Sequence, residues 1–74
     1  MTKLQVIKDI IQEYADNPCE ALSVFVVGKH TYKLTYDSCL QEVCLHDYRT
    51  WNAIEWSHKT KVHRLATAII TRRD

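Results

Sequence analysis

Two cysteines and two histidines in the second half of the chain come nearest to a known chemical pattern. They follow the spacing C-x4-C-x13-H-x4-H, near that of two-Cys, two-His zinc fingers: Cys39, Cys44, His58 and His63. On a regular helix, however, two histidines five residues apart differ by roughly 140° in direction, so they cannot easily bind one ion. We therefore expect no metal and no other cofactor, with both cysteines buried as small apolar side chains and both histidines half-exposed on a helix.

A second arrangement would be nucleophilic. Cys44 lies beside His46, and Cys19 lies in the same half of the chain as His30. Cysteine catalysis also needs an orienting group and an oxyanion pocket, and no glycine-rich loop that could form such a pocket is present. There is also no phosphate-binding loop and no paired-carboxylate pattern. The sequence predicts that the protein is not an enzyme and has no catalytic residues.

A third candidate is the basic C-terminal segment. Residues 1–56 carry five basic and eight acidic side chains, whereas residues 57–74 carry five basic and one acidic. The basic side chains of this segment could neutralise phosphates, and Trp51 or Trp56 could stack on a base; these basic residues are Lys59, Lys61, Arg64, Arg72 and Arg73. The same charges also suit a solvated helix face, where Arg72 and Arg73 favour the negative end of the helix dipole. Nucleic-acid binding through this segment, to RNA or DNA, is the alternative function.

Large aromatic side chains are abundant for a chain of 74 residues. The seven aromatic residues are Tyr14, Phe25, Tyr32, Tyr36, Tyr48, Trp51 and Trp56. A small core cannot bury all of them, and exposed Trp and Tyr side chains dominate binding hot spots. This surplus, without a catalytic pattern, favours a module that docks on another protein. The residues that we expect to bind the partner are Val24, Val26, Trp56, Lys59, His63 and Arg64.

The elements that would position these residues begin with a helix. Thr2 and Gln5 resemble a capping box, and the apolar residues that follow recur on one helical face. Because the residue before a proline is pushed out of the helical region, Pro18 ends the helix. The pattern predicts a helix over residues 3–16.

Residues 22–36 predict a β-hairpin with Gly28-Lys29 as its two-residue turn. This turn pairs Phe25 with Tyr32 and places Val24 and Val26 on the other face. The first strand is thus apolar on both faces. Such a strand is either central in its sheet or carries an apolar surface for a partner.

Residues 38–46 fit either a strand or a short helix, and we predict a third strand. From Trp51 onward, six residues recur at helical spacing: Trp51, Ile54, His58, Val62, Leu65 and Ile69. This spacing predicts a long helix, which can break at Ser57-His58 into two shorter helices. Trp56, Lys59 and His63 would lie on the opposite, exposed side.

The predicted architecture is a single α+β domain over residues 1–74, in the order αβββα. This order resembles the double-stranded RNA-binding domain, whose hairpin glycine and histidine and last-helix lysines have counterparts in Gly28-Lys29-His30, Lys59 and Lys61. The resemblance implies RNA contacts at those residues. The family's hairpin proline and its serine-lysine-lysine signature are absent here, and Trp56-Ser57-His58 stands in place of the latter.

Three cysteines leave one unpaired, and no apolar stretch looks like a signal peptide or a membrane span. We expect a cytoplasmic protein with no membrane partner. In size and composition the chain resembles small inhibitors and regulators encoded by phages or mobile elements. Because a core of this size contributes little stability, a homo-oligomer is a further expectation.

Overall fold

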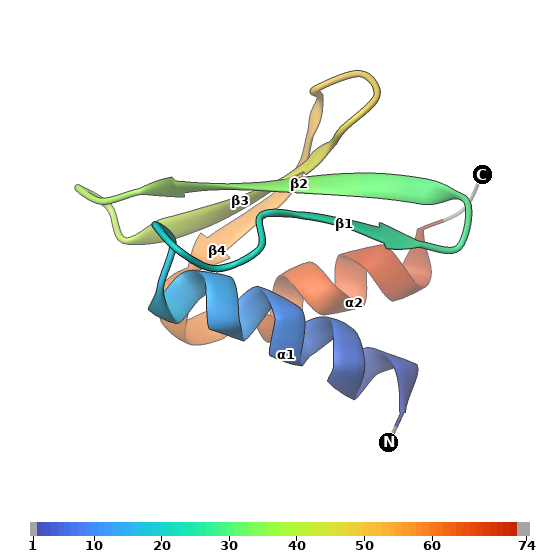
Figure 1. The fold of residues 1–74 in the computed structure, drawn as a ribbon, viewed down its shortest axis with the longest axis horizontal. Coiled ribbons are helices and arrows are strands. Elements are labelled where there is room, and N and C mark those ends of the chain that lie inside the picture. Colours follow the sequence, from blue (N-terminus) through green and yellow to red (C-terminus); the bar gives the residue numbers. More distant parts are fainter. Residues whose placement is uncertain (1, 73–74) are drawn as a thin grey trace.

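Two helices cover one face of a four-stranded antiparallel sheet in the computed structural model, which describes residues 2–72 (Figure 1). The elements are α1 (Lys3–Asp16), β1 (Val24–Val27), β2 (His30–Asp37), β3 (Glu42–Asp47), β4 (Ala53–His58), the 3-10 helix η1 (Lys59–Lys61) and α2 (His63–Thr71). The strands lie side by side in sequence order. The α+β class is as predicted, with one more strand than expected.

Helix α1 confirms the prediction for residues 3–16. Thr2 caps it, because the Thr2 Oγ1 atom accepts a hydrogen bond of 3.2 Å from the backbone N–H of Gln5. The helix ends at Asn17, before Pro18. Its apolar face buries Ile7 and Ile11 against the rest of the core.

The β1–β2 hairpin has the predicted register. Phe25 pairs with Tyr32, Val24 with Lys33 and Val26 with Thr31, and the turn residue Gly28 has φ +61°. However, β1 lies at the edge of the sheet. Of the two alternatives for this strand, the central position is therefore wrong, and Val24 and Val26 lie on a sheet face that no described helix covers.

Strand β3 confirms the third strand, although it begins at Glu42 and not at Ser38. Residues 38–41 form a turn instead. The Asp37 carboxylate binds the backbone N–H groups of Cys39 and Leu40, at 2.9 and 3.2 Å. These bonds favour a turn over an extension of the strand.

The predicted long helix from Trp51 is wrong in its first half, because residues 53–58 form β4. Trp51 has φ +64° in the turn after β3, and its N–H donates to the Asp47 carbonyl at 2.7 Å. A bulge follows, since Leu45 pairs with Glu55 but His46 pairs with Ala53. The turn and the extra residue shift the apolar spacing from two toward three and four, which imitates a helix.

The predicted break at Ser57-His58 into two shorter helices is also wrong, because a strand and not a helix precedes this point. Strand β4 ends at His58, η1 follows, and the described part of the C-terminal segment then forms α2. Of the six residues on the predicted helical face, Val62, Leu65 and Ile69 are buried, whereas Trp51 and His58 are exposed. The fourth strand also replaces the αβββα order on which the resemblance to the double-stranded RNA-binding domain rested.

The core lies between the helices and the near face of the sheet. The helices contribute Ile7, Ile11, Tyr14, Ala15, Val62, Leu65, Ala66 and Ile69, and the sheet contributes Phe25, Tyr32, Leu34, Val43 and Leu45. None of the helices in residues 2–72 has both the length and the apolar character that crossing a membrane requires.

Candidate binding surfaces

The first candidate surface is the sheet face turned away from the helices (Figure 1). Because side chains alternate along a strand, the pairing register places eleven residues on this open sheet face: Val24, Val26, Thr31, Lys33, Thr35, Asp37, Glu42, Cys44, His46, Trp56 and His58. Both helices lie on the opposite side. The open sheet face is therefore the largest part of the sheet available to a partner.

The predicted partner-binding residues divide between two places. Val26 and Trp56, which are 67% and 56% exposed, lie on the open sheet face together with the half-buried Val24. Lys59 belongs to η1, and His63 and Arg64 to the first turn of α2. Trp56 and Arg64 nevertheless line the same groove, of about 440 Å³, beside β4.

The edge of β4 is partly covered by its own side chains. The Glu55 carboxylate accepts a 3.0 Å hydrogen bond from the backbone N–H of Trp56. It also lies 4.0 Å from the Arg64 guanidinium, an exposed ion pair of small energetic value. A bonded N–H group at the strand edge makes the addition of another strand less favourable there.

Polar side chains on the open sheet face bond to one another. Lys33 Nζ donates to Ser23 Oγ at 2.8 Å, and Thr35 Oγ1 lies 2.9 Å from His46 Nε2. Burial raises the pKa of the Cys44 thiol, and the carboxylates of Glu42 and Glu55 raise it further. A raised pKa keeps the thiol protonated, which makes Cys44 a poor nucleophile beside His46.

An aromatic cluster connects the open sheet face to the β3–β4 loop. The Trp51 ring lies 5.9 Å from the His46 ring and 6.1 Å from the Tyr48 ring, between centroids. Trp51 is 54% exposed and Tyr48 is 47% exposed. Sequence reasoning placed Trp51 on a buried helix face and so missed this cluster.

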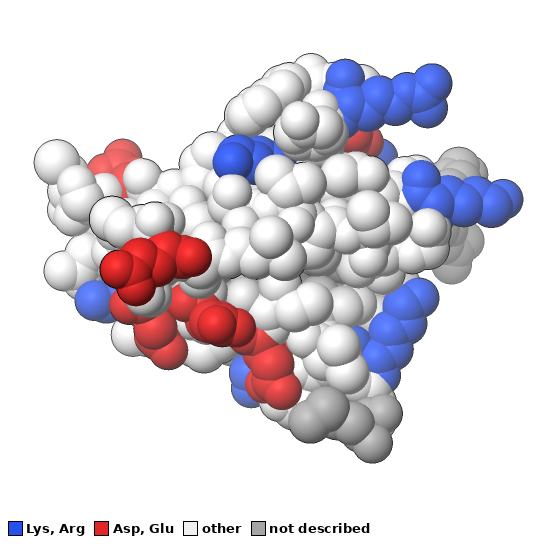
Figure 2. All heavy atoms as spheres, viewed as in Figure 1, with Lys and Arg blue, Asp and Glu red and all other residues white. Residues whose placement is uncertain are grey.

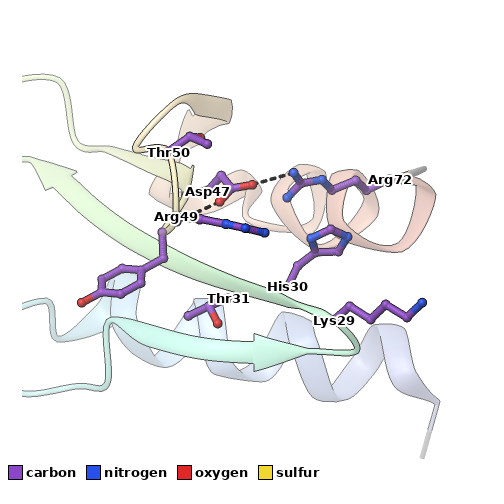
Figure 3. Close-up of a pocket in the computed structure, with 8 residues that line it drawn as sticks. Lys29, His30, Thr31, Asp47, Arg49, Thr50 and Arg72 are labelled. Atoms are coloured by element: carbon purple, nitrogen blue, oxygen red, sulfur yellow. Dashed lines mark hydrogen bonds and ion pairs between the residues drawn. The ribbon is translucent and has the colours of Figure 1, made fainter.

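The second candidate surface is a cavity of about 880 Å³ at one end of the sheet (Figure 3). It is lined by the β1–β2 turn, the β3–β4 loop and the end of α2, through Lys29, His30, Thr31, Asp47, Tyr48, Arg49, Thr50 and Arg72. We call it the basic cavity. Figure 2 shows Lys and Arg atoms at this end of the molecule, with Asp and Glu atoms gathered toward the opposite end.

Asp47 and Arg72 form the rigid wall of the basic cavity. Arg72 Nη2 donates to Asp47 Oδ2 at 2.6 Å, and the Arg49 N–H donates to Asp47 Oδ1 at 2.9 Å. The hydrogen bond from Arg72, followed by that from Arg49, lowers the pKa of the Asp47 carboxyl. The Arg72 guanidinium also lies 5.6 Å from the centroid of the Tyr32 ring.

Sequence reasoning did not find the basic cavity. It grouped Arg72 with the other basic residues of the C-terminal segment, and it gave Lys29 only a turn position and an RNA-contact resemblance. The three segments that line the basic cavity are distant in the chain, so no spacing motif links Lys29, Arg49 and Arg72. The only local signal is Asp47 two residues before Arg49, a spacing that suits a side-chain-capped turn.

The proposed zinc residues are separated among different elements. Cys39 lies in the β2–β3 turn and is exposed, which contradicts the expected burial, and Cys44 lies half-buried on the open sheet face. His58 ends a strand and not a helical turn, and its Nδ1 atom lies 2.9 Å from Thr60 Oγ1. Within residues 2–72, no three Cys, His, Asp or Glu side chains form a metal-binding group.

Comparisons of the chain with protein families, with curated proteins and with solved structures give no match.

Proposed function

We propose that this protein is a non-enzymatic binding module that docks another protein on its open sheet face. The observation that carries the proposal is Trp56, an indole that is 56% exposed on an uncovered sheet. Val24 and Val26 extend the apolar character of the same face to the opposite edge of the sheet. Large aromatic side chains in such positions supply most of the energy at protein interfaces.

The charge of the face supports a protein partner over a nucleic acid. Lys33 is the one Lys or Arg residue on this face, its ammonium group already binds Ser23, and the face also carries the carboxylates of Asp37 and Glu42. A phosphate backbone would instead require several unpaired cations along its path. The partner that fits has a largely apolar contact surface with few charges. The module would act as an inhibitor or regulator by covering that surface, and its small size and composition support this role.

The arrangement at β4 supports docking on the face over pairing at the edge. Glu55 occupies the outward N–H of Trp56, so an incoming strand would have to displace a carboxylate. The Trp56 side chain itself lies on the open sheet face. We also propose a cytoplasmic location, which the three free thiols support.

The test is the Trp56→Ala variant, measured against the partner isolated from the source cells with the tagged protein and then purified. We expect affinity to fall by about 2 kcal/mol or more, because truncation removes a hot-spot indole. Stability should change by less than about 1 kcal/mol, because the side chain lies outside the core. Leu40→Ala is the matched control, since Leu40 is 61% exposed but lies in the β2–β3 turn.

Three outcomes would contradict the proposal. Unchanged binding by Trp56→Ala would show that Trp56 does not contribute to the interface. Loss of folding in this variant would show that Trp56 stabilises the fold as a core residue does. A Trp56-dependent homodimer in sedimentation equilibrium would show that a second copy of this chain, and not another protein, binds the open sheet face. If Lys59→Ala and Arg64→Ala weaken binding to any nucleic acid and reduce its salt dependence, the alternative function through the C-terminal segment would replace docking.

A further inference from the structure

We propose that the basic cavity is a binding site for the phosphate of a nucleotide. This inference is independent of the proposed docking, because Trp56 is not among the residues that line the cavity. It also differs from nucleic-acid binding through Lys59 and Arg64, because neither of these residues lines it. The argument rests on charge, on the position of the guanidinium groups and on the neighbouring aromatic rings.

Positive charge exceeds negative charge in the basic cavity. Three cationic side chains line it, Lys29, Arg49 and Arg72, against the single carboxylate of Asp47. That carboxylate already accepts hydrogen bonds from Arg72 and from the Arg49 backbone. Among the described residues, neither Lys29 nor Arg49 has an ion-pair partner for its side chain. Two unpaired charges therefore remain for an anion.

Two of these charges, on Arg49 and Arg72, approach one another. In Figure 3 the Arg49 guanidinium extends from the β3–β4 loop toward Arg72 and His30, whereas the Lys29 side chain extends along the adjoining turn, away from Arg49. The Arg72 guanidinium is held by Asp47 and lies over the Tyr32 ring, whereas the Arg49 guanidinium has no ion-pair partner among the described residues. An oxyanion would accept hydrogen bonds from both guanidinium groups.

The neighbouring aromatic rings favour a nucleotide over a simple anion. Tyr48 lines the basic cavity and contacts Trp51, and both rings are about half-exposed. Exposed aromatic faces beside a cationic groove are the combination that binds a base and its phosphate together. The volume of about 880 Å³ also accommodates much more than a phosphate group. The phosphate belongs either to a free nucleotide or to a single strand, and the experiment separates these two sources.

The experiment is calorimetric titration of the full chain with inorganic phosphate, uridine monophosphate and a short 5′-phosphorylated oligouridylate. We expect both nucleotide ligands to bind at least about tenfold more tightly than inorganic phosphate, since stacking adds to the ionic contacts. Oligonucleotide binding stronger than mononucleotide binding assigns the site to a strand, and equal binding assigns it to a free nucleotide. Both results support the proposal.

Variants then locate the site. Lys29→Ala combined with Arg49→Ala should weaken nucleotide binding at least about tenfold, because it removes the two unpaired cations. Lys59→Ala combined with Lys61→Ala removes the same charge elsewhere and should leave affinity unchanged. Tyr48→Leu should lower nucleotide affinity toward that of inorganic phosphate, and Trp56→Ala should bind normally. Circular dichroism checks that each variant is folded.

Several results would overturn the inference. These are no binding by the wild-type protein at millimolar nucleotide, unchanged binding by the Lys29 and Arg49 double variant, and equal affinity for nucleotide and inorganic phosphate. Tighter binding of an acidic peptide than of any nucleotide would show that the cavity takes protein carboxylates instead. In contrast, if the Lys29 and Arg49 double variant loses nucleotide binding but still binds the protein partner normally, the basic cavity and the open sheet face are separate sites.

Discussion

Asp47 connects the β3–β4 loop to the end of α2. Its two carboxylate oxygens accept hydrogen bonds from different segments, one from the Arg72 side chain and one from the Arg49 backbone. Both bonds are stronger to the ionised carboxylate than to the neutral carboxyl, so they lower the pKa of Asp47. The hydrogen bond between the Arg72 and Asp47 side chains is also the main cause of the raised pKa of Arg72, and Tyr32 makes a smaller contribution.

A pH dependence of stability follows from this lowered pKa. The unfolded carboxyl titrates near ~3.9, so the contribution of ionised Asp47 is fully present above that pH and is lost as pH falls through the lower folded value. Asp47→Asn should therefore be less stable at neutral pH and lose less stability on acidification below about pH 4. Urea midpoints measured from neutral to acidic pH test this. Parallel pH curves for the two proteins would contradict it.

Gly28 is the second residue whose conformation matters. It has φ +61°, and a Cβ atom added there would have no neighbour within 4 Å. The effect of a substitution is therefore the backbone strain alone. Gly28→Val should cost about 1 kcal/mol or more in free energy of unfolding, because a β-branched residue is strained at positive φ. Gly28→Asn, which tolerates positive φ, should cost less, and equal stability of all three proteins would argue against this turn.

At the scale of elements, β4 determines the architecture. It supplies the edge that carries Trp56, and with η1 it takes the place of the first half of the expected helix. Ser57 points into the core and is 3% exposed, whereas its neighbours Trp56 and His58 are exposed. Alternation of this kind between consecutive residues is typical of a strand that is buried on one face.

A pair of neighbouring substitutions tests this strand. Ser57→Asp should destabilise the protein by about 2 kcal/mol or more, because it places a carboxylate in the core. His58→Asp should change stability by less than about 1 kcal/mol, since the site is exposed and aspartate can still accept the Thr60 N–H that His58 now binds. Thermal and urea unfolding of both variants provide the measurement. Equal effects at the two positions would mean that they share one environment.

At the scale of the whole molecule, the described helices leave one face of the sheet uncovered. Two helices cover one sheet face, and the open sheet face and the basic cavity remain accessible on other sides (Figures 1 and 3). A chain of 74 residues has a core that contributes only about 3 to 5 kcal/mol of stability. A partner bound to either surface would add to it by mass action.

The remaining question at this scale is whether a metal stabilises the fold. Cys39, Cys44, His58 and His63 lie on separate turns, strands and a helix, so a single ion cannot collect them without rearrangement. Treatment with a chelator should therefore leave the far-UV circular dichroism and the melting temperature unchanged. A large loss of helical or strand signal on chelation, restored by zinc, would contradict this expectation.

Local sequence patterns determined the elements whose signals are short in range. The cap at Thr2, the stop before Pro18 and the turn at Gly28 each depend on a few neighbouring residues. The alternation of Val43 and Leu45 likewise predicted the third strand, and the apolar spacing of Val62, Leu65 and Ile69 predicted the buried face of the last helix. These features follow from backbone sterics and side-chain periodicity.

Tertiary structure alone decided the identity of β4 and the location of both candidate surfaces. The bulge at Ile54 and the positive φ at Trp51 arise from pairing with β3, and together they gave the sequence a false helical period. Position in the sheet decided that β1 is an edge strand. The basic cavity joins Lys29, Arg49 and Arg72 across three segments, and contacts between segments distant in the chain leave no mark on local periodicity.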